Sequence, residues 1–552
     1  MTSVLVVRRP WELDPVARVW GTGGWTSPEE REALDWLTLV RLLVWDVRTS
    51  TEAGGERPDV CVVACDPEAA AAGLSRMLGW AEAGSLVVLP LDAAPAELRA
   101  GLDAGSAGAG SAIRWTGIGD GGEWRSRTPV PHTALRPGQL WEVATEIDEV
   151  AVVAAARRGK GSTAVLGFHP SAARDASGAM TQVLVRLLTG YAPEPLAWLD
   201  LAGTVVLRMD DPGGAQNAYS RDWCYRKLSS PEWERVGDDL RRRSARISLA
   251  YSAGFVDDGD ALRGRLRVGG REPLREAGSV HPSPLVTYED VAGHSPGSVY
   301  DYAGEYAGIA ALVDRGVASV ELHGYTHLHP DLREWAAAPD RYEAMSWFRE
   351  LGPRAAAALR RLGPGDHPLA RGRAEIERWF NGAPTTLVCP GEEWTDDVLA
   401  TALDLGVELV GSYYLALRHD DRFCWTTHVC SPYLDEPDPA WFDSPLPVVG
   451  YMHDRDLVHH GVEWLDRWLG EWVSAGATSF TDYREIAALL RAPVSLRRDD
   501  DGWVVAAGDG ALRPATPVSV RVRTGDEAPV RFEVAGQKVL TPSEETEARP
   551  SG

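Results

Sequence analysis

Cysteine and long apolar runs are scarce in this chain, and each scarcity excludes a class of protein. Only six cysteines occur in 552 residues and none shows the Cys-x2-Cys spacing of a zinc module, so neither a disulfide framework nor a cysteine-rich zinc site is expected. No stretch of about 18 apolar residues is present, so no transmembrane helix is expected. The first ten residues lack a basic region followed by a sustained apolar segment, so we expect no secretory signal and a cytoplasmic location.

Positive charge is also low. The chain has 56 Lys and Arg residues against 80 Asp and Glu residues, which gives a formal net charge of −24. Such a chain repels nucleic acid and anionic membrane surfaces, so we expect neither partner and no membrane insertion. Hydrophobic content of 44% and charged content of 25% match an average globular protein, and the length predicts two or three domains. Nothing in the sequence indicates the oligomeric state.

The first 200 residues alternate strand-like and helix-like patterns. Strands are predicted at residues 4–7, 60–64 and 86–89, and an alanine-rich helix at 67–82. This alternation predicts an α/β domain with a mostly parallel sheet covered on both faces. The turn and strand at residues 159–170 resemble the late strand of class I glutamine-amidotransferase-like domains, which implies a flavodoxin- or amidotransferase-like fold for residues 1–200.

This first domain lacks the nucleophile of an amidotransferase. Such an enzyme needs a cysteine at a sharp strand-to-helix turn. Cys65 follows a predicted strand but has no flanking glycines, and residues 86–90 contain no nucleophile. His169 stands alone after a strand, where a histidine is more often structural than catalytic. We therefore expect the domain to be non-catalytic.

Residues 201–490 form a second alternating series. The predicted strands are residues 204–207, 247–251, 318–322, 386–389, 407–410 and 447–450, and the predicted helices are 302–315, 334–362 and 395–405. This count predicts a (β/α) barrel, in which functional residues gather at the carboxyl ends of the strands. Residues 256–300 are predicted to be an insertion on that rim. Residues 491–552 alternate short strands with turns, which predicts a small antiparallel β unit with a polar tail.

Two short stretches at predicted strand ends carry ligands for a divalent cation. Asp210 and Asp211 precede Pro-Gly-Gly, which would end the strand and let both carboxylates face one site. His323 directly follows another strand, and His327 would lie on the same side if the segment wound into a helix. Each pair alone has an ordinary explanation, a turn or cap for the aspartates and chance spacing for the histidines. Together they predict a metal site.

The two stretches, residues 208–214 and 323–327, resemble the NodB-type polysaccharide deacetylase superfamily (carbohydrate esterase family 4), and the resemblance extends over about residues 203–490. It implies a deacetylase-type barrel and a metal-dependent hydrolase. It also implies the following roles: Asp210 as catalytic base, and Asp211, His323 and His327 as metal ligands.

Two later segments match further motifs of that family. The segment 388–394 is similar to the third motif, which implies a substrate or oxyanion region at Pro390, Gly391, Glu392 and Trp394. The family usually begins this motif with an arginine that orients the base, but Cys389 stands in that region. Arg208, two residues before Asp210, is a candidate to replace the arginine.

The general acid of the family is a late histidine in a leucine-x-histidine motif. His453 is the nearest match, and Asp454 is a candidate to orient it. His459 and His460 compete for the role. They precede Trp464, Trp468 and Trp472, whose helical spacing predicts core packing, so a surface or packing role is expected for this pair.

These residues predict a hydrolase that removes an N-acyl group, most simply N-acetyl, from an amino sugar, a glycoconjugate or a small N-acylated metabolite. Two imidazoles and a carboxylate suit zinc best, and cobalt, nickel, manganese or iron are compatible. The cation would polarise the acyl carbonyl, Asp210 would take a proton from water, and His453 would give one to the leaving amine. Two alternatives stay open: a degenerate binding or scaffold protein on the same fold, and a metal-independent glycosidase that uses Asp210 with a distant carboxylate.

Overall fold

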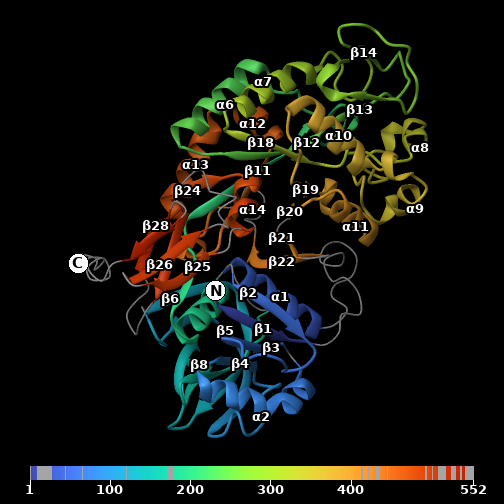
Figure 1. Ribbon diagram of the computed structural model, residues 1–552. Coiled ribbons are helices and arrows are strands. Elements are labelled where there is room, and N and C mark those ends of the chain that lie inside the picture. Colours follow the sequence, from blue (N-terminus) through green and yellow to red (C-terminus); the bar gives the residue numbers. More distant parts are fainter. Residues whose placement is uncertain are drawn as a thin grey trace.

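Two large sheets dominate the molecule, one drawn in blue and cyan and the other in green to orange (Figure 1). The structure is a computed structural model and describes residues 2–8, 28–43, 45–64, 66–119, 121–170, 179–214, 216–411, 414–419, 422–429, 436–443, 445–491, 494–499, 502–507, 518–523, 530–534 and 537–540. Among these residues no helix combines the length and the apolar character needed to cross a membrane.

The first sheet contains nine strands: β1 (Ser3–Val7), β2 (Asp46–Ser50), β3 (Val60–Val63), β4 (Leu86–Pro90), β5 (Leu102–Trp115), β6 (Gly122–Pro137), β7 (Glu142–Ile147), β8 (Val150–Arg158) and β9 (Gly161–Leu166). Their order is β2-β1-β3-β4-β9-β8-β7-β5-β6. The first five strands of this order, β2, β1, β3, β4 and β9, pair in parallel. The other four, β8, β7, β5 and β6, continue the sheet with antiparallel pairing. The prediction of a parallel sheet therefore holds for one half, while hairpins build the other half.

Helices cover both faces of this sheet because successive strand residues point to opposite sides. Helices α1 (Pro28–Leu42) and α4 (Ala179–Tyr191) share an apolar cluster with Val4 and Val6. Helix α2 (Pro67–Ala83) contributes to a second cluster with Leu5 and Val7. The predicted layering, helix on sheet on helix, is therefore present.

The second sheet is built from β11 (Thr204–Gly213), β12 (Ile247–Ser252), β18 (Ala318–Leu322), β19 (Thr386–Val388), β20 (Leu409–Gly411), β21 (Tyr414–His419), β22 (Arg422–Val429), β23 (Val448–His453) and β24 (Ser479–Thr481). Their order is β22-β21-β20-β19-β18-β12-β11-β23, with β24 also paired to β11. Six neighbouring strands pair in parallel, in the order β20, β19, β18, β12, β11 and β23. The hairpin β21–β22 is antiparallel and pairs with β20.

This second sheet is open in the part of the chain that the structure describes. We predicted a closed barrel, but the antiparallel hairpin occupies one edge and β23 the other, and no hydrogen-bonded pairing joins β22 to β23. The carboxyl ends of the six parallel strands still meet at one edge. The sheet therefore gathers the strand-end residues as a barrel would, without closing.

Helices flank the second sheet: α5 (Gln216–Tyr219), α6 (Ser230–Arg242), α7 (Tyr302–Asp314), α8 (Leu332–Ala336), α9 (Ala356–Leu359), α10 (Pro368–Phe380), α11 (Asp396–Asp404), α12 (Asp454–His460), α13 (Trp464–Ala475) and α14 (Tyr483–Arg491). The prediction of a single helix over residues 334–362 is wrong. Short turns separate α8 from α9, since Pro339 and Pro353 each start a new 3-10 turn instead of continuing a helix. Core packing of the tryptophan stripe is confirmed, because Trp468 and Trp472 are buried in the apolar core.

The insertion after β12 forms small antiparallel pieces: β13 (Gly254–Val256), β14 (Gly264–Val268), β15 (Val280–Pro282), β16 (Val286–Asp290) and β17 (Val299–Asp301). Its side chains make a separate core with Tyr219 and Trp335, in which aromatic rings contact edge to face. The insertion is thus an ordered wall beside the sheet edge.

The last strands are β25 (Val494–Asp499), β26 (Gly502–Ala507), β27 (Val518–Arg523), β28 (Val530–Val534) and β29 (Gln537–Leu540). They are antiparallel, as predicted, but they belong to two sheets. β25, β26 and β29 pair together, whereas β27 and β28 pair with β10 (Leu196–Leu199). The predicted polar tail after Pro542 lies outside the described residues.

Candidate metal centre and its cavity

Asp210 and Asp211 lie on β11 at the carboxyl edge of the second sheet. β11 pairs in parallel with β12 and β23, and its register with β12 shifts between Asp210 and Gly213. Asp211 has a φ of 80°, which interrupts the normal alternation of side chains along the strand. The strand ends at Gly213, within the Pro-Gly-Gly sequence that was predicted to end it, and an irregular step at Asp211 precedes that end. Both aspartates line one cavity of about 320 Å³.

His323 and His327 come together in a turn and not in the helix that their spacing suggested. The buried Glu350 carboxylate accepts hydrogen bonds from three consecutive backbone N–H groups, those of residues 325–327. Gly324 has a φ of 64°, and a Cβ at this position would lie 1.9 Å from Oε2 of Glu350. The turn therefore wraps around a carboxylate, which only a glycine at position 324 permits.

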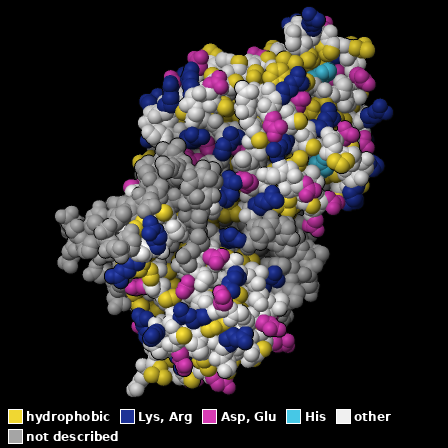
Figure 2. Space-filling model, in the orientation of Figure 1, with side chains coloured by type: hydrophobic (Ala, Val, Ile, Leu, Met, Phe, Trp, Pro, Cys, Tyr) yellow, Lys and Arg dark blue, Asp and Glu magenta, His cyan; other side chains and the backbone are white. Residues whose placement is uncertain are grey.

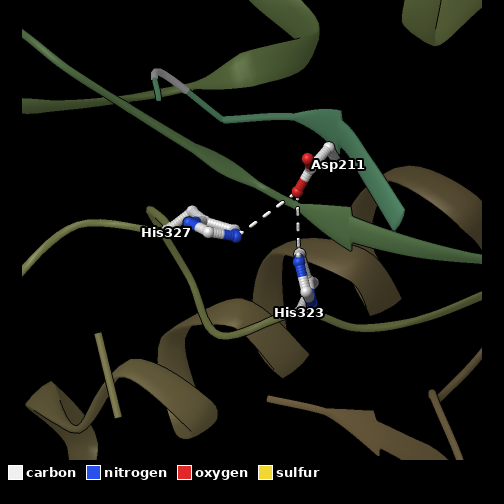
Figure 3. A group of neighbouring side chains, drawn as sticks. All are labelled: Asp211, His323 and His327. Carbon is white, nitrogen blue, oxygen red and sulfur yellow. Dashed lines mark ion pairs between the residues drawn. The ribbon is translucent and has the colours of Figure 1, made fainter. Parts of the chain in front are cut away.

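The three expected metal ligands converge from two elements (Figure 3). Nε2 of His323 and Nε2 of His327 lie 3.4 Å and 3.3 Å from Oδ1 of Asp211. Nδ1 of His323 donates to the carbonyl of Val388 at 2.9 Å, so the Nε2 lone pair is available when the ring is neutral. Within the described residues this buried Nε2 makes no hydrogen bond. One ligand atom from each residue lies within 4.8 Å of the others, and the set fits a cation such as zinc with an open position.

The charges around Asp211 favour its ionised form. Burial raises the pKa of Asp211, but the adjacent imidazoles of His323 and His327 lower it well below the ordinary range. Burial lowers the pKa of His323, and the Asp211 carboxylate more than offsets this and raises it. Oδ2 of Asp211 also accepts a hydrogen bond from Nε1 of Trp223 at 2.9 Å. A carboxylate held ionised and oriented in this way is suited to binding a cation.

Arg208 places a guanidinium against Asp210. Its Nε donates to Oδ1 of Asp210 at 2.8 Å, and its Nη2 donates to Oδ2 of Asp210 and to Oε1 of Glu392. The guanidinium lies 4.3 Å from the ring centroid of Tyr451, and the Arg208 side chain is 1% exposed. Burial lowers the pKa of Arg208, but the two carboxylates raise it well above the ordinary value. Cys389 is buried in the cavity wall, where burial raises the pKa of its thiol.

His453 ends β23 and lines the same cavity. Its Nε2 lies 2.8 Å from the hydroxyl of Tyr451, and its ring meets Trp223 edge to face with 5.1 Å between centroids. The backbone N–H of His453 donates to Oδ2 of Asp456 at 2.8 Å. Asp456, and not the expected Asp454, is therefore the carboxylate that fixes His453.

A buried ion network lies directly behind the metal ligands. Nζ of Lys227 lies 2.7 Å from Oδ2 of Asp454 and 3.1 Å from Oε1 of Glu305, and it donates to the carbonyl of Asp211 at 3.2 Å. The hydroxyl of Tyr225 donates to Oδ1 of Asp454. Burial lowers the pKa of Lys227, but the two carboxylates raise it above its ordinary value. The ammonium thus fixes the backbone of Asp211, and Lys227 itself is not part of the cavity lining.

The cavity contains most of the predicted site residues. Those on its lining are Asp210, Asp211, His323, His327, Gly391, Glu392 and His453, whereas Pro390 and Trp394 are not on it. Trp394 is instead part of the apolar core, and His459 and His460 are exposed. Sequence reasoning missed the lining residues Gln216, Ser220, Asp222, Trp223, Tyr342, Glu343 and Phe348, which carry no motif or spacing that marks them. It gave no role to Tyr451, although Tyr451 lies two residues before His453 on β23, the spacing that puts two side chains on one face of a strand.

The first sheet contributes no reactive thiol in its described part. Burial raises the pKa of Cys61 to about 12, and Cys65 lies outside the described residues. The His169 ring lies 3.4 Å from the Asp92 carboxylate and 3.6 Å from that of Glu32. The structural role predicted for His169 stays a prediction.

No family model matches the chain, and no curated protein matches it. Among solved structures, it is similar to that of Agd3, a carbohydrate deacetylase, over 98% of this chain and 99% of the other, with 9% identity and a TM-score of 0.40. A CE4 family pseudoenzyme from Bacillus anthracis matches over 54% of this chain and 71% of its own, with 11% identity and a TM-score of 0.27. A beta-galactosidase from Bacillus circulans sp. alkalophilus matches over 36% of this chain and 32% of its own, with 13% identity and a TM-score of 0.25. At TM-scores this low, the functional argument rests on the geometry of the site alone.

Proposed function

We propose that this chain is a metal-dependent hydrolase that removes an N-acyl group, most simply N-acetyl, from an amino sugar or a related N-acylated compound. One observation carries the proposal: Asp211, His323 and His327 present three ligand atoms within 4.8 Å of one another, on a cavity that also contains Asp210 and His453. A base, an acid and a cation site on one cavity are the groups that amide hydrolysis requires.

Asp211, His323 and His327 would hold the cation, with zinc the best fit to two imidazoles and a carboxylate, and cobalt, nickel, manganese or iron as compatible metals. When bound, such a cation supplies Lewis-acid activation of water and of the acyl carbonyl. The ion network behind Asp211 keeps its backbone in place through the bond from Lys227.

Asp210 is the proposed base. Arg208 donates to both of its carboxylate oxygens, which fixes the plane of the carboxylate and leaves its remaining lone pairs free to accept a proton. We assign Arg208 the orienting role that the resemblance gives to an arginine of the third motif. The scaffold alternative, based on the missing arginine, is weaker for that reason.

His453 is the proposed acid. It lines the cavity on β23, where it is the register partner of Asp210 on β11, and its ring contacts Trp223 and the hydroxyl of Tyr451. A protonated imidazole in this position can give its proton to the leaving amine. The backbone N–H of Gly391, also on the lining, is the proposed donor to the developing oxyanion.

Backbone strain at the cavity also supports a functional site. Three of its non-glycine residues have positive φ angles: Asp211 at 80°, His327 at 58° and Glu392 at 56°. Each such conformation costs roughly 1–3 kcal/mol, and clusters of them occur where function requires the geometry.

The division into residues 1–200, 201–490 and 491–552 is likewise a proposal, with no catalytic role for the first part. The burial of Cys61 and the ion contacts of His169 support that reading.

Two conservative variants test the proposal. Asp210→Asn keeps the shape of the base but not its basicity, so it should retain the metal and lose turnover of an N-acetylated amino-sugar oligomer, measured as released acetate. Asp211→Asn should lose both the metal and the turnover. Full activity in Asp210→Asn would refute the assignment of the base. Cleavage of the oligomer into shorter sugars that survives complete metal removal would favour the glycosidase alternative.

A further inference from the structure

The cavity is lined by an excess of acidic side chains. Five carboxylates border it: Asp210, Asp211, Asp222, Glu343 and Glu392. Among the described residues, no Lys or Arg is part of the lining. The outer surface is different, because acidic and basic side chains are interspersed over the face that Figure 2 shows. The charged side chains of the cavity lining are therefore of one sign, unlike those on that face of the molecule.

Three of the five carboxylates are compensated within the site. Asp210 and Glu392 share the guanidinium of Arg208. Asp211 faces two imidazoles and belongs to the proposed cation site. The remaining two, Asp222 and Glu343, form no ion pair with any Lys or Arg of the described chain. They make up what we call the acidic lip.

The two carboxylates of the acidic lip lie on adjoining segments. Oε1 of Glu343 accepts hydrogen bonds from the hydroxyl of Ser220 at 2.7 Å and from the backbone N–H groups of Arg221 and Asp222 at 2.6 Å and 3.2 Å. Burial raises the pKa of Glu343, but these hydrogen bonds lower it below its ordinary value. Asp222 is exposed at the mouth of the cavity. Two negative charges consequently face the space that a substrate enters.

Aromatic rings stand next to the acidic lip in the chain and in the cavity. Trp223 follows Asp222, Tyr342 precedes Glu343, and all four residues line the cavity together with Phe348. Aromatic faces attract cations and also provide apolar contact for a sugar ring. Carboxylates combined with aromatic rings are a general means of binding an ammonium group.

We propose that the preferred substrate carries a protonated amine close to the N-acyl group that is removed, as in a partly deacylated amino-sugar chain. This inference rests on the proposed function and adds the substrate class. Hydrolysis of one amide consumes one water and releases a carboxylic acid and a free amine, which is protonated near neutral pH. Each turnover on a chain therefore creates the kind of group that the acidic lip would bind for the next turnover.

Two tetramers of N-acetylglucosamine provide the test, one fully acetylated and one with a single free amine. With the metal-loaded protein, we expect a kcat/KM about tenfold higher for the amine-bearing tetramer, because one ammonium gains two carboxylate neighbours. Added salt should reduce this preference by screening. The preference should fall towards unity in Asp222→Asn and in Glu343→Gln, whose side-chain carbonyl can still accept the backbone hydrogen bonds.

Asp366→Asn is the matched control, because it removes the same charge at a residue that is exposed and absent from the cavity lining. It should keep the full preference of the unmodified protein. Equal kcat/KM for the two tetramers, or a preference that survives both lip variants, overturns the inference while leaving the proposed hydrolysis intact. Failure of the loaded protein to hydrolyse either tetramer overturns the proposed function and this inference with it.

Discussion

Arg208 and Asp210 lie two residues apart on β11, and the Arg208 guanidinium donates to both carboxylate oxygens of Asp210. Residues at this spacing on a strand point to the same face, so the strand itself brings the pair together. Arg208 is therefore our proposed counterpart of the orienting arginine that the family resemblance would place beside Cys389, and it lies on the strand of the proposed base. This relationship suggests several measurements.

Replacing Arg208 with Lys should lower kcat by about a hundredfold, which is the usual scale for losing one oriented polar contact at an active site. A lysine retains the charge but cannot donate to both oxygens of Asp210 at once. Metal content should stay the same, as measured by elemental analysis. Arg241→Lys, on an exposed pair with Asp238, is the control and should leave kcat unchanged. Unchanged turnover in Arg208→Lys would remove the orienting role.

Gly324→Ala should destabilise the protein and abolish metal binding. The new Cβ would lie 1.9 Å from Oε2 of Glu350, the carboxylate that holds the histidine turn, and the φ of 64° disfavours any side chain. Gly316→Ala is the matched control, since it has a φ of 69° but no atom within 4 Å of the new Cβ. Urea denaturation should show a loss of about 1 kcal/mol for the control and a larger loss for Gly324→Ala. Equal losses would show that the contact with Glu350 is unimportant.

Metal removal should lower the thermal midpoint. A ligand that binds only the folded state at a thousandfold excess over Kd stabilises it by about 4 kcal/mol. The unmodified protein should therefore respond to a chelator in a thermal melt, and His327→Ala should not. A chelator response that persists in His327→Ala would place the metal elsewhere.

Lys227→Met should destabilise the fold by about 3–5 kcal/mol, the cost of leaving buried charge without a partner. The variant leaves Asp454 and Glu305 without their shared cation, and all three side chains are fully buried. Lys160→Met, at an exposed lysine, serves as the control. The free energy of unfolding in urea measures both, and equal values for the two variants would contradict the prediction.

Glu32→Gln should alter how stability depends on pH. Burial raises the pKa of Glu32 from 4.5 to about 7, although His169 lowers it in part. The unfolded chain loses this proton first, so the stabilisation is complete below pH 4.5 and is lost as the pH rises through about 7. The loss amounts to about 3 kcal/mol.

Denaturation in urea at acidic and neutral pH measures this change. The difference in unfolding free energy between the two pH values should be smaller in Glu32→Gln than in the unmodified protein. Glu68→Gln, at an exposed glutamate, should leave the difference as it was. Identical pH dependence in Glu32→Gln would show that Glu32 does not titrate as described.

The sequence by itself indicated β1, β3, β4 and β9 of the first sheet and the parallel strands β11, β12, β18, β19, β20 and β23 of the second. It also placed Asp210, Asp211 and His323 at strand ends, whereas His453 was found only through the family resemblance. Apolar runs bounded by turn residues are a local signal, and parallel strands bring their carboxyl ends to one edge in any such sheet. The open second sheet was not predicted, because pairing at sheet edges depends on contacts far apart in the chain. The break-up of residues 334–362 has a local cause, since Pro339 and Pro353 each start a new turn.

Only the tertiary structure decided how the ligands are held. Glu350 shapes the histidine turn, Trp223 and Lys227 fix Asp211, and Asp222 with Glu343 gives the cavity its charge. These residues come from loops without periodicity, and a single buried carboxylate or lysine has no signature in a sequence. Their effect arises from burial, since removal from water is what makes a charge require a partner at a particular place.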